Sequence, residues 1–276
     1  MTDRVAHAIS ETITTLRSAG LKLESWVILS QSNRVVLELR PCGWIAKVVH
    51  REASERLNRE VALSQHIAAC AGPCARPATP SGPFLARTVA VSLWQPIAST
   101  GLLSESDIGR AYAELRPCLD SFTEPLPDFH VAIRDANELL QAEDLPGMTA
   151  QDNAFVRAVF DHALSELAAF HWTTRVLHGD PHSGNITLTP QGARWFDLES
   201  ACNGPLEWDL TALPSGALAV DHDPALLAVL LTLRRACVVT WCAAKAVPSP
   251  VEREAIAHHL AQLSSRASGA LAGPGW

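Results

Sequence analysis

One run of polar residues in the second half of the chain constrains the fold most. Residues 178–185 read His-Gly-Asp-Pro-His-Ser-Gly-Asn, and Asp197 follows twelve residues after Asn185, directly behind the apolar pair at 195–196. Asn185 and Asp197 offer the hard oxygen donors that Mg²⁺ prefers, and Asp180 is left to receive the proton of an attacking hydroxyl. Phosphoryl transfer needs both kinds of group at one place, because its catalysis depends on positioning and charge neutralisation. The chain must therefore fold so that these three side chains meet.

The size and charge of the chain limit its class. It has 276 residues, of which 47% are hydrophobic and 18% are charged, so it is long enough for one large domain or for two lobes. The formal net charge is −7. A nucleic-acid-binding protein is expected to carry a basic surplus, so this balance argues against nucleic acid as a partner.

Cysteine usage and the apolar segments favour a cytoplasmic protein with no membrane partner. The seven cysteines are scattered, without paired CxxC blocks or a histidine at zinc-like spacing, which predicts reduced thiols. The N-terminus lacks the basic-then-apolar pattern of a signal peptide. The most apolar run, residues 224–247, contains Arg234 and Arg235 near its middle, and this favours a buried helix over a membrane span.

Residues 1–94 have the pattern of a small β-rich lobe with one internal helix. Short runs rich in Val, Ile and Trp alternate with turn residues, and this favours an antiparallel meander. Apolar residues at helical spacing precede the meander, and a charge-rich segment that reads as a helix follows it. The predicted segments are a helix over 3–19, strands over 25–29, 34–40 and 44–50, a helix over 51–69, a Pro/Gly-rich loop over 72–83, and one or two strands within 84–93.

Beyond this lobe, residues 95–101 read as a connector and residues 102–276 as a mainly helical lobe. Ser104 is well placed to cap the first of its helices. The helices are predicted over 104–119, 128–141, 152–172, 224–247 and 250–271, and the polar run at 178–185 follows the third of them.

These residues resemble those of the aminoglycoside phosphotransferase and choline kinase-like family of small-molecule kinases. The catalytic loop of that family reads His-Gly-Asp-x-His-x-x-Asn, and residues 178–185 match it at every fixed position. The glycine after His178 distinguishes the loop from that of protein kinases, which usually have arginine there. The resemblance extends from the turn at 32–35 to the C-terminal helices, and it implies the α+β, bilobal protein-kinase-like fold.

The resemblance also implies roles for the residues of the loop. Asp180 is the expected catalytic base, and Asn185 and Asp197 are the expected metal ligands. Glu199 is either a further ligand, directly or through water, or a surface residue, and the sequence leaves the two equally open.

In the first lobe, the family's phosphate-binding lysine corresponds to Lys47, which lies between apolar residues of a predicted strand. Such a lysine needs an anionic partner, for which Glu60 fits and Glu52 and Glu55 are rivals, because the register of the helix is not fixed. The turn at 30–33 contains no glycine, so the Ser32 hydroxyl or backbone amides are expected to replace a Gly-rich phosphate loop.

The connector is expected to bind the edge of an adenine through its backbone. Pro96 has no N–H to donate. If one residue accepts from the adenine amine and the residue two further on donates to the ring, the carbonyl of Gln95 and the amide of Ile97 are the matching pair.

The expected function is Mg²⁺-dependent transfer of the γ-phosphoryl group of ATP, with GTP left open, to a hydroxyl of a small molecule. An aminoglycoside-type antibiotic and an amino-alcohol or sugar metabolite are both compatible acceptors, and the chain is expected to be a monomer or a homodimer. The alternative is a catalytically inactive nucleotide-binding pseudokinase or scaffold. The absence of glycine from the turn at 30–33 favours this alternative.

Overall fold

In the computed structural model, which describes residues 3–31, 34–142, 144–217 and 221–271, the chain forms two units with separate hydrophobic cores. Unit 1 consists of Met1–Leu126, His178–Ala201 and Leu213–Ala219, and unit 2 consists of Pro127–Leu177, Cys202–Ala212 and Val220–Trp276. The polar run at 178–185 thus belongs to the same unit as the N-terminal strands. The lobe boundary expected at 95–101 stays a prediction.

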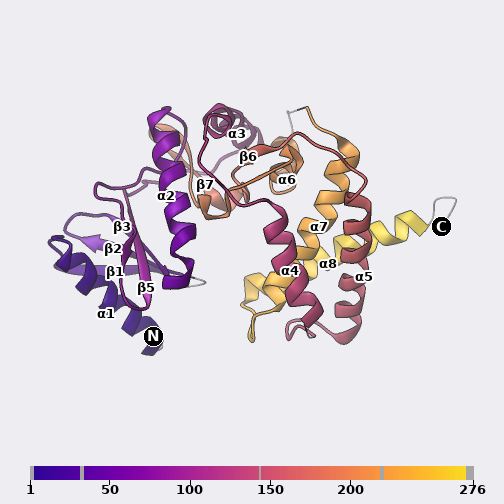
Figure 1. The fold of residues 1–276 in the computed structure, drawn as a ribbon, viewed down its shortest axis with the longest axis horizontal. Helices are drawn as coiled ribbons and strands as arrows, with labels where there is room; N and C mark the ends of the chain where they lie inside the picture. Colours follow the sequence, from indigo (N-terminus) through magenta and orange to yellow (C-terminus); the bar gives the residue numbers. More distant parts are fainter. Residues whose placement is uncertain (1–2, 32–33, 143, 218–220, 272–276) are drawn as a thin grey trace. The chain divides into compact units, whose positions relative to one another are not determined.

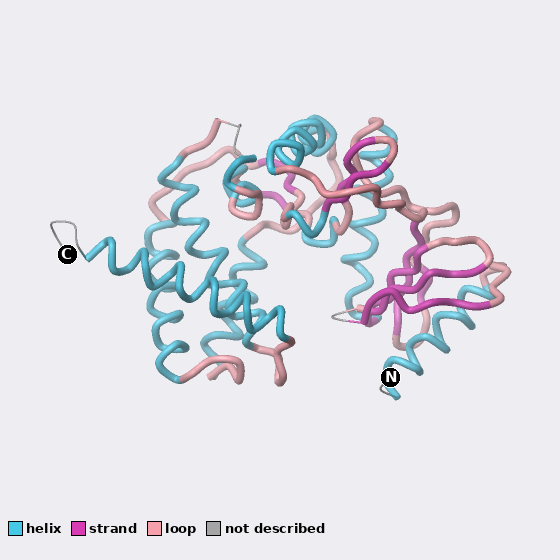
Figure 2. The backbone as a smooth tube through the Cα atoms, turned by 180° about the vertical axis from the view of Figure 1, so that it is seen from behind, coloured by secondary structure: helices cyan, strands magenta, loops and turns pink. Residues whose placement is uncertain are grey.

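A five-stranded antiparallel sheet is the main feature of unit 1 (Figures 1 and 2). Its strand order is β1-β2-β3-β5-β4. The strands are β1 Ser25–Gln31, β2 Val35–Arg40, β3 Ile45–His50, β4 Phe84–Leu85 and β5 Val89–Trp94. The meander predicted for the first three strands is confirmed, because each pairs with the next in antiparallel register.

The two faces of this sheet have different partners. Leu37, Ala46 and Val48 lie on one face, where they form a buried cluster with Ile13 of the helix α1, Asp3–Ser18. Successive side chains of a strand point to opposite faces. Lys47 therefore points away from α1, to the face where it contacts Glu60 of the helix α2, Ser54–Ala69.

The other elements of unit 1 are helices and one hairpin. They are η1 Arg51–Ala53, α2 Ser54–Ala69, α3 Glu105–Asp120, η2 Ser183–Asn185, β7 Ile186–Thr189, β8 Gly192–Trp195, η3 Leu198–Ser200 and η4 Ser215–Ala217. The predicted cap of α3 is confirmed. The Ser104 hydroxyl accepts a hydrogen bond from the Asp107 amide, and the Asp107 carboxylate accepts one from the Ser104 amide. In the β7–β8 hairpin, Ile186 is paired with Trp195, so the residues flanking the hairpin meet at its open end.

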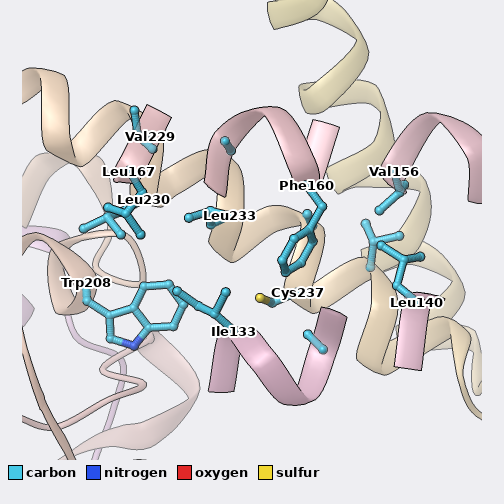
Figure 3. Packing of buried hydrophobic residues seen from close by; sticks show 14 of the residues in the cluster. Ile133, Leu140, Val156, Phe160, Leu167, Trp208, Val229, Leu230, Leu233 and Cys237 are labelled. Atoms are coloured by element: carbon cyan, nitrogen blue, oxygen red, sulfur yellow. The ribbon is translucent and has the colours of Figure 1, made fainter. Parts of the chain in front are cut away.

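Unit 2 is mainly helical and is built around α7. Its elements are α4 His130–Ala142, α5 Ala150–Leu167, β6 Arg175–Leu177, β9 Cys202–Gly204, α6 Leu206–Leu210, α7 Pro224–Ala243 and α8 Pro250–Leu271. Figure 3 shows Leu230, Leu233 and Cys237 of α7 packed among side chains that include Phe160 and Trp208. Among the described residues, α7 alone is long and apolar enough to cross a membrane, by length and composition. In this structure it is a core helix, and its Arg234 is buried with the guanidinium 3.7 Å from the Trp208 ring centroid.

The structure also corrects the bounds of two predicted helices. The helix predicted over 224–247 ends at Ala243. The helix predicted over 152–172 begins at Ala150, after a capping box made by Thr149 and Asp152, and ends at Leu167. The short elements β6, β7, β9 and α6 were not predicted, because three to five residues are too few to show a period.

All seven cysteines lie in the described part of the chain, and each is a free thiol.

Candidate active site

The loop at 178–185 is fixed by its first two residues. The His178 side chain is fully buried, with its ring edge-on to that of Trp195 at 5.3 Å between centroids. Gly179 has φ of +87°, and a Cβ atom there would lie 1.9 Å from the backbone oxygen of Ser200. Both the left-handed backbone and the close approach require glycine. A larger residue, such as the arginine of protein kinases, cannot fit at this position.

Gly179→Ala should therefore destabilise the protein by roughly 2–4 kcal/mol, because it combines an unfavourable φ with a steric overlap. Gly192→Ala is the matched control. Gly192 also has a positive φ, of +97°, but its nearest neighbour is an Arg194 nitrogen at 4.0 Å. The control should lose only about 1 kcal/mol. Urea denaturation of both variants tests this, and equal losses would show that the contact with Ser200 does not hold the loop.

Asp180 lies beside His182 within the loop. The Nδ1 atom of His182 accepts a hydrogen bond from the Gly184 amide at 2.9 Å, so in the neutral ring the proton is on Nε2. This nitrogen is 3.6 Å from Oδ2 of Asp180, and the two side chains are 48% and 40% exposed. The imidazole thus presents an N–H toward the carboxylate, which remains open to solvent.

The side-chain amide of Asn185 is held in one orientation. Its Nδ2 atom donates to the backbone oxygen of Asp180 at 2.9 Å, which fixes the direction of the amide group. In the part of the chain that the structure describes, Oδ1 of Asn185 has no hydrogen-bond partner. The Phe196 amide donates to the backbone oxygen of Asn185 at 3.0 Å, so Asn185 lies next to the segment that carries Asp197.

Asp197 stands in a left-handed conformation, with φ of 65° and ψ of 55°. This conformation is unfavourable for a residue other than glycine and is concentrated at functional sites. Its Oδ1 atom is 2.9 Å from Nζ of Lys47, and its Oδ2 atom accepts from the Arg34 guanidinium. Burial alone would raise the pKa of this carboxyl, but the charges of Lys47 and Arg34 outweigh it and hold the pKa below its ordinary value.

Lys47 is also paired with Glu60, at 2.5 Å between Nζ and Oε1. Of the three acids considered from the sequence, Glu60 is therefore the partner, and it comes from the buried side of α2. Only 9% of Lys47 and 1% of Glu60 is exposed. Burial raises the pKa of Glu60, and Lys47 opposes that shift. The second oxygen of Glu60, Oε2, is buried without a hydrogen-bond partner.

Arg34 is the site residue that sequence reasoning missed. Its guanidinium pairs with Asp197 and with Glu199, where Nη1 is 2.8 Å from Oε1. Burial lowers the pKa of Arg34, and the two carboxylates more than compensate, so the pKa is raised overall. The strand register places Arg34 on the face of Lys47, because Val36 is paired with Lys47 and Arg34 lies two positions earlier. This register comes from the structure and is not readable from the sequence.

The acidic groups fit a divalent metal. Ligand oxygens of Glu60, Asp197 and Glu199 lie within 4.8 Å of one another, and the unpaired Oε2 of Glu60 is buried near this cluster. Together with Oδ1 of Asn185, the donor set consists of hard oxygens, which is the set that Mg²⁺ takes in proteins. Asn185, Asp197 and Glu199 stay the predicted ligands.

The connector after β5 presents free backbone groups. The Gln95 amide donates to the backbone oxygen of Arg76 at 2.9 Å. Within the described ranges, neither the Gln95 carbonyl nor the Ile97 amide has a partner. Ile97 also packs with Trp94 and Phe196, and the connector lines a cavity of about 320 Å³. The Gln95 carbonyl and the Ile97 amide are therefore available to a planar ligand. Ser32, the other residue predicted to contact the nucleotide, lies outside the described residues.

Known proteins share a family model and a fold with this chain. The model of the phosphotransferase enzyme family matches residues 28–247. None of the curated proteins matches the sequence significantly. The chain is similar to several solved structures, and their low sequence identity means that the likeness concerns the fold.

Three of these structures illustrate the likeness. A microcompartment-associated aminopropanol kinase is 16% identical, with a TM-score of 0.71 over 94% of this chain and 98% of that one. The amicoumacin kinase hAmiN, in complex with AMP-PNP, Ca²⁺ and Ami, is 11% identical, with a TM-score of 0.69 over 96% of each chain. The GDP complex of wild-type aminoglycoside 2′-phosphotransferase-IIIa is 13% identical, with a TM-score of 0.62 over 96% of this chain and 98% of that one. The predicted α+β, kinase-like fold is confirmed.

Proposed function

Since the chain belongs to the phosphotransferase enzyme family, we propose that it moves the γ-phosphoryl group of a nucleoside triphosphate to a hydroxyl of a small molecule. One observation carries the proposal. Lys47 joins Glu60 to Asp197 by two ion pairs, and Asn185 hydrogen-bonds Asp180, so charge-neutralising, metal-binding and proton-accepting groups are gathered in unit 1. Phosphoryl transfer needs these three kinds of group together.

Each residue has a defined task in this proposal. The carboxylate of Asp180 orients the acceptor hydroxyl and takes its proton as the hydroxyl oxygen bonds to the γ-phosphorus. The bond from that phosphorus to the bridging oxygen breaks, and the nucleoside diphosphate leaves. Lys47, held by Glu60, neutralises charge on the α- and β-phosphates. Asn185 and Asp197, with Glu199 as a further ligand, would hold Mg²⁺, which when bound neutralises charge on the triphosphate. Transfer is direct, because the proposal requires no nucleophilic side chain of the protein.

The donor is proposed to be ATP, with GTP as the alternative. Two of the similar structures contain AMP-PNP and GDP respectively, so the fold accommodates both bases in other proteins. The Gln95 carbonyl and the Ile97 amide provide one acceptor and one donor, which is the pair that an adenine edge requires. Comparing kcat/KM for ATP and GTP at fixed Mg²⁺ decides between them.

The acceptor is proposed to be a small alcohol that also carries an amine. By their names, similar proteins act on an aminoglycoside and on aminopropanol, which share these groups. The net charge of −7 is compatible with a cationic acceptor. Whether the acceptor is an antibiotic or a metabolite does not follow from the fold.

The decisive experiment is a phosphorylation screen of the purified chain. Aminoglycosides, other hydroxylated antibiotics, amino alcohols and sugars are incubated with Mg·ATP, and products are detected by the mass of an added phosphoryl group. Transfer to at least one amine-bearing alcohol supports the proposal. The glycine-free turn at 30–33 favours the rival, a pseudokinase. Binding of Mg·ATP in a thermal-shift assay, with no transfer to any member of a broad hydroxyl library, would establish that rival.

A further inference from the structure

Arg34 occupies the carboxylates that the proposed function assigns to the metal. Its two terminal nitrogens bind different acids, one contacting Oδ2 of Asp197 and the other lying 2.8 Å from Oε1 of Glu199. The Arg34 side chain is 22% exposed, and those of Asp197 and Glu199 are 15% and 27% exposed. A single guanidinium therefore bridges both acids in a partly buried setting.

The charges around this bridge nearly balance. Glu60, Asp197 and Glu199 contribute three negative charges, and Lys47 and Arg34 contribute two positive ones. Both oxygens of Asp197 are engaged, Oδ1 by Lys47 and Oδ2 by Arg34. Like charges repel each other strongly in a partly buried setting. A divalent cation entering beside Arg34 is repelled by the guanidinium and finds both oxygens of Asp197 occupied, so one of the resident cations has to leave.

Arg34 is the cation that can leave. Lys47 is 9% exposed and fixed between two acids, and its Nζ is 5.8 Å from the centroid of the Trp94 ring. Arg34 directly precedes β2, and its side chain is 22% exposed, against 11% for that of Lys47. Its planar fork of N–H donors matches phosphate oxygens as well as it matches carboxylates. An arriving triphosphate therefore offers the guanidinium new partners near the site.

Resting on the proposed function, we propose that Arg34 is a positioning residue that exchanges partners when substrate binds. In the metal-free chain it holds Asp197 and Glu199 in place of the cation. When a metal–nucleotide complex arrives, the cation takes these carboxylates and the guanidinium pairs with the triphosphate. Free metal consequently binds weakly, and metal and nucleotide enter as one unit.

The test measures binding of Mn²⁺, as a probe for Mg²⁺, by titration calorimetry of the full chain. Without nucleotide, Arg34→Met should bind Mn²⁺ at least about 10-fold more tightly than the wild type, equivalent to about 1.4 kcal/mol. Adding AMP-PNP should raise Mn²⁺ affinity strongly in the wild type and much less in the variant. Arg40→Met, at the end of β2, is the matched control, because Arg40 is exposed and its side chain pairs only with Glu38 among the described residues. It should behave as wild type.

Arg34→Lys covers the case in which Arg34→Met does not fold. One ammonium group cannot span both acids as the fork does, so this variant should keep one of the two ion pairs and bind free Mn²⁺ about 3-fold more tightly than the wild type. The inference is overturned if a folded variant binds free Mn²⁺ no more tightly than the wild type. That result leaves the proposed function intact provided the wild type binds Mn²⁺ with AMP-PNP. If the wild type binds no Mn²⁺ even with AMP-PNP, the proposed function itself fails.

Discussion

Asp180→Asn should lower kcat by roughly 10²–10⁴-fold, the usual contribution of a positioned general base. Asparagine keeps the size of the side chain and one acceptor oxygen, so it can still orient the acceptor hydroxyl but cannot take its proton. The KM for Mg·ATP should stay within about twofold, because in the proposed site Asp180 faces the acceptor and not the nucleotide. Initial rates at saturating nucleotide, with the acceptor found by the screen, measure both constants.

The same substitution should leave stability nearly unchanged. The Asp180 side chain is 40% exposed, and substitutions at such positions usually change stability by less than about 0.5 kcal/mol. Asp161→Asn is the control, since Asp161 is exposed on α5 and its contact with Gln141 can be kept by asparagine. Wild-type turnover in Asp180→Asn would remove this residue from the mechanism. A parallel loss of nucleotide affinity would instead make it a binding residue.

Local patterns in the sequence predicted the elements that carry the site. The strands around Lys47 are short, alternating and separated by turn residues, and the loop at 178–185 is a contiguous motif. Lys47 was recognised because a charged residue inside an apolar strand needs a partner. The sequence leaves three acids as candidate partners of Lys47, because helical periodicity does not determine which residues of a helix contact a sheet. Glu60 is the one on the buried side of α2, and Glu52 lies before the helix in η1.

The parts that escaped prediction depend on contacts between distant segments. Arg34 and Asp197 are separated by 163 positions in the sequence, and no local pattern specifies that they meet. The strands β6 and β9 contain three residues each and exist because they pair with each other. Such elements are determined by tertiary packing and not by their own composition. A pairing of this kind has to be observed in a structure.

Asp197→Asn should have the second large effect, lowering kcat/KM by roughly 10³-fold, or about 4 kcal/mol of transition-state stabilisation. The amide keeps the shape of the carboxylate but removes the negative charge that attracts the metal and the side chains of Lys47 and Arg34. The Mg²⁺ concentration for half-maximal rate should rise as well. Glu199→Gln is the comparison, because Glu199 contacts Arg34 but not Lys47 in the described structure. It should lose less activity than Asp197→Asn, and an equal or larger loss would make Glu199 the main metal ligand.

Asp197→Asn should also change how stability depends on pH. The pKa of Asp197 lies below its ordinary value in the folded chain, because Lys47 and Arg34 outweigh the effect of burial. An acid with a depressed folded pKa stabilises the fold above its unfolded pKa, near 3.9, and loses this contribution as the pH falls through the folded pKa. The variant lacks this contribution at every pH. The wild type should therefore be more stable than the variant at pH 7, and urea denaturation should show the difference shrinking below about pH 4. A difference that stays constant down to pH 2 would mean that the two ion pairs contribute nothing to stability, and that Asp197 is held in its left-handed conformation by its backbone neighbours alone.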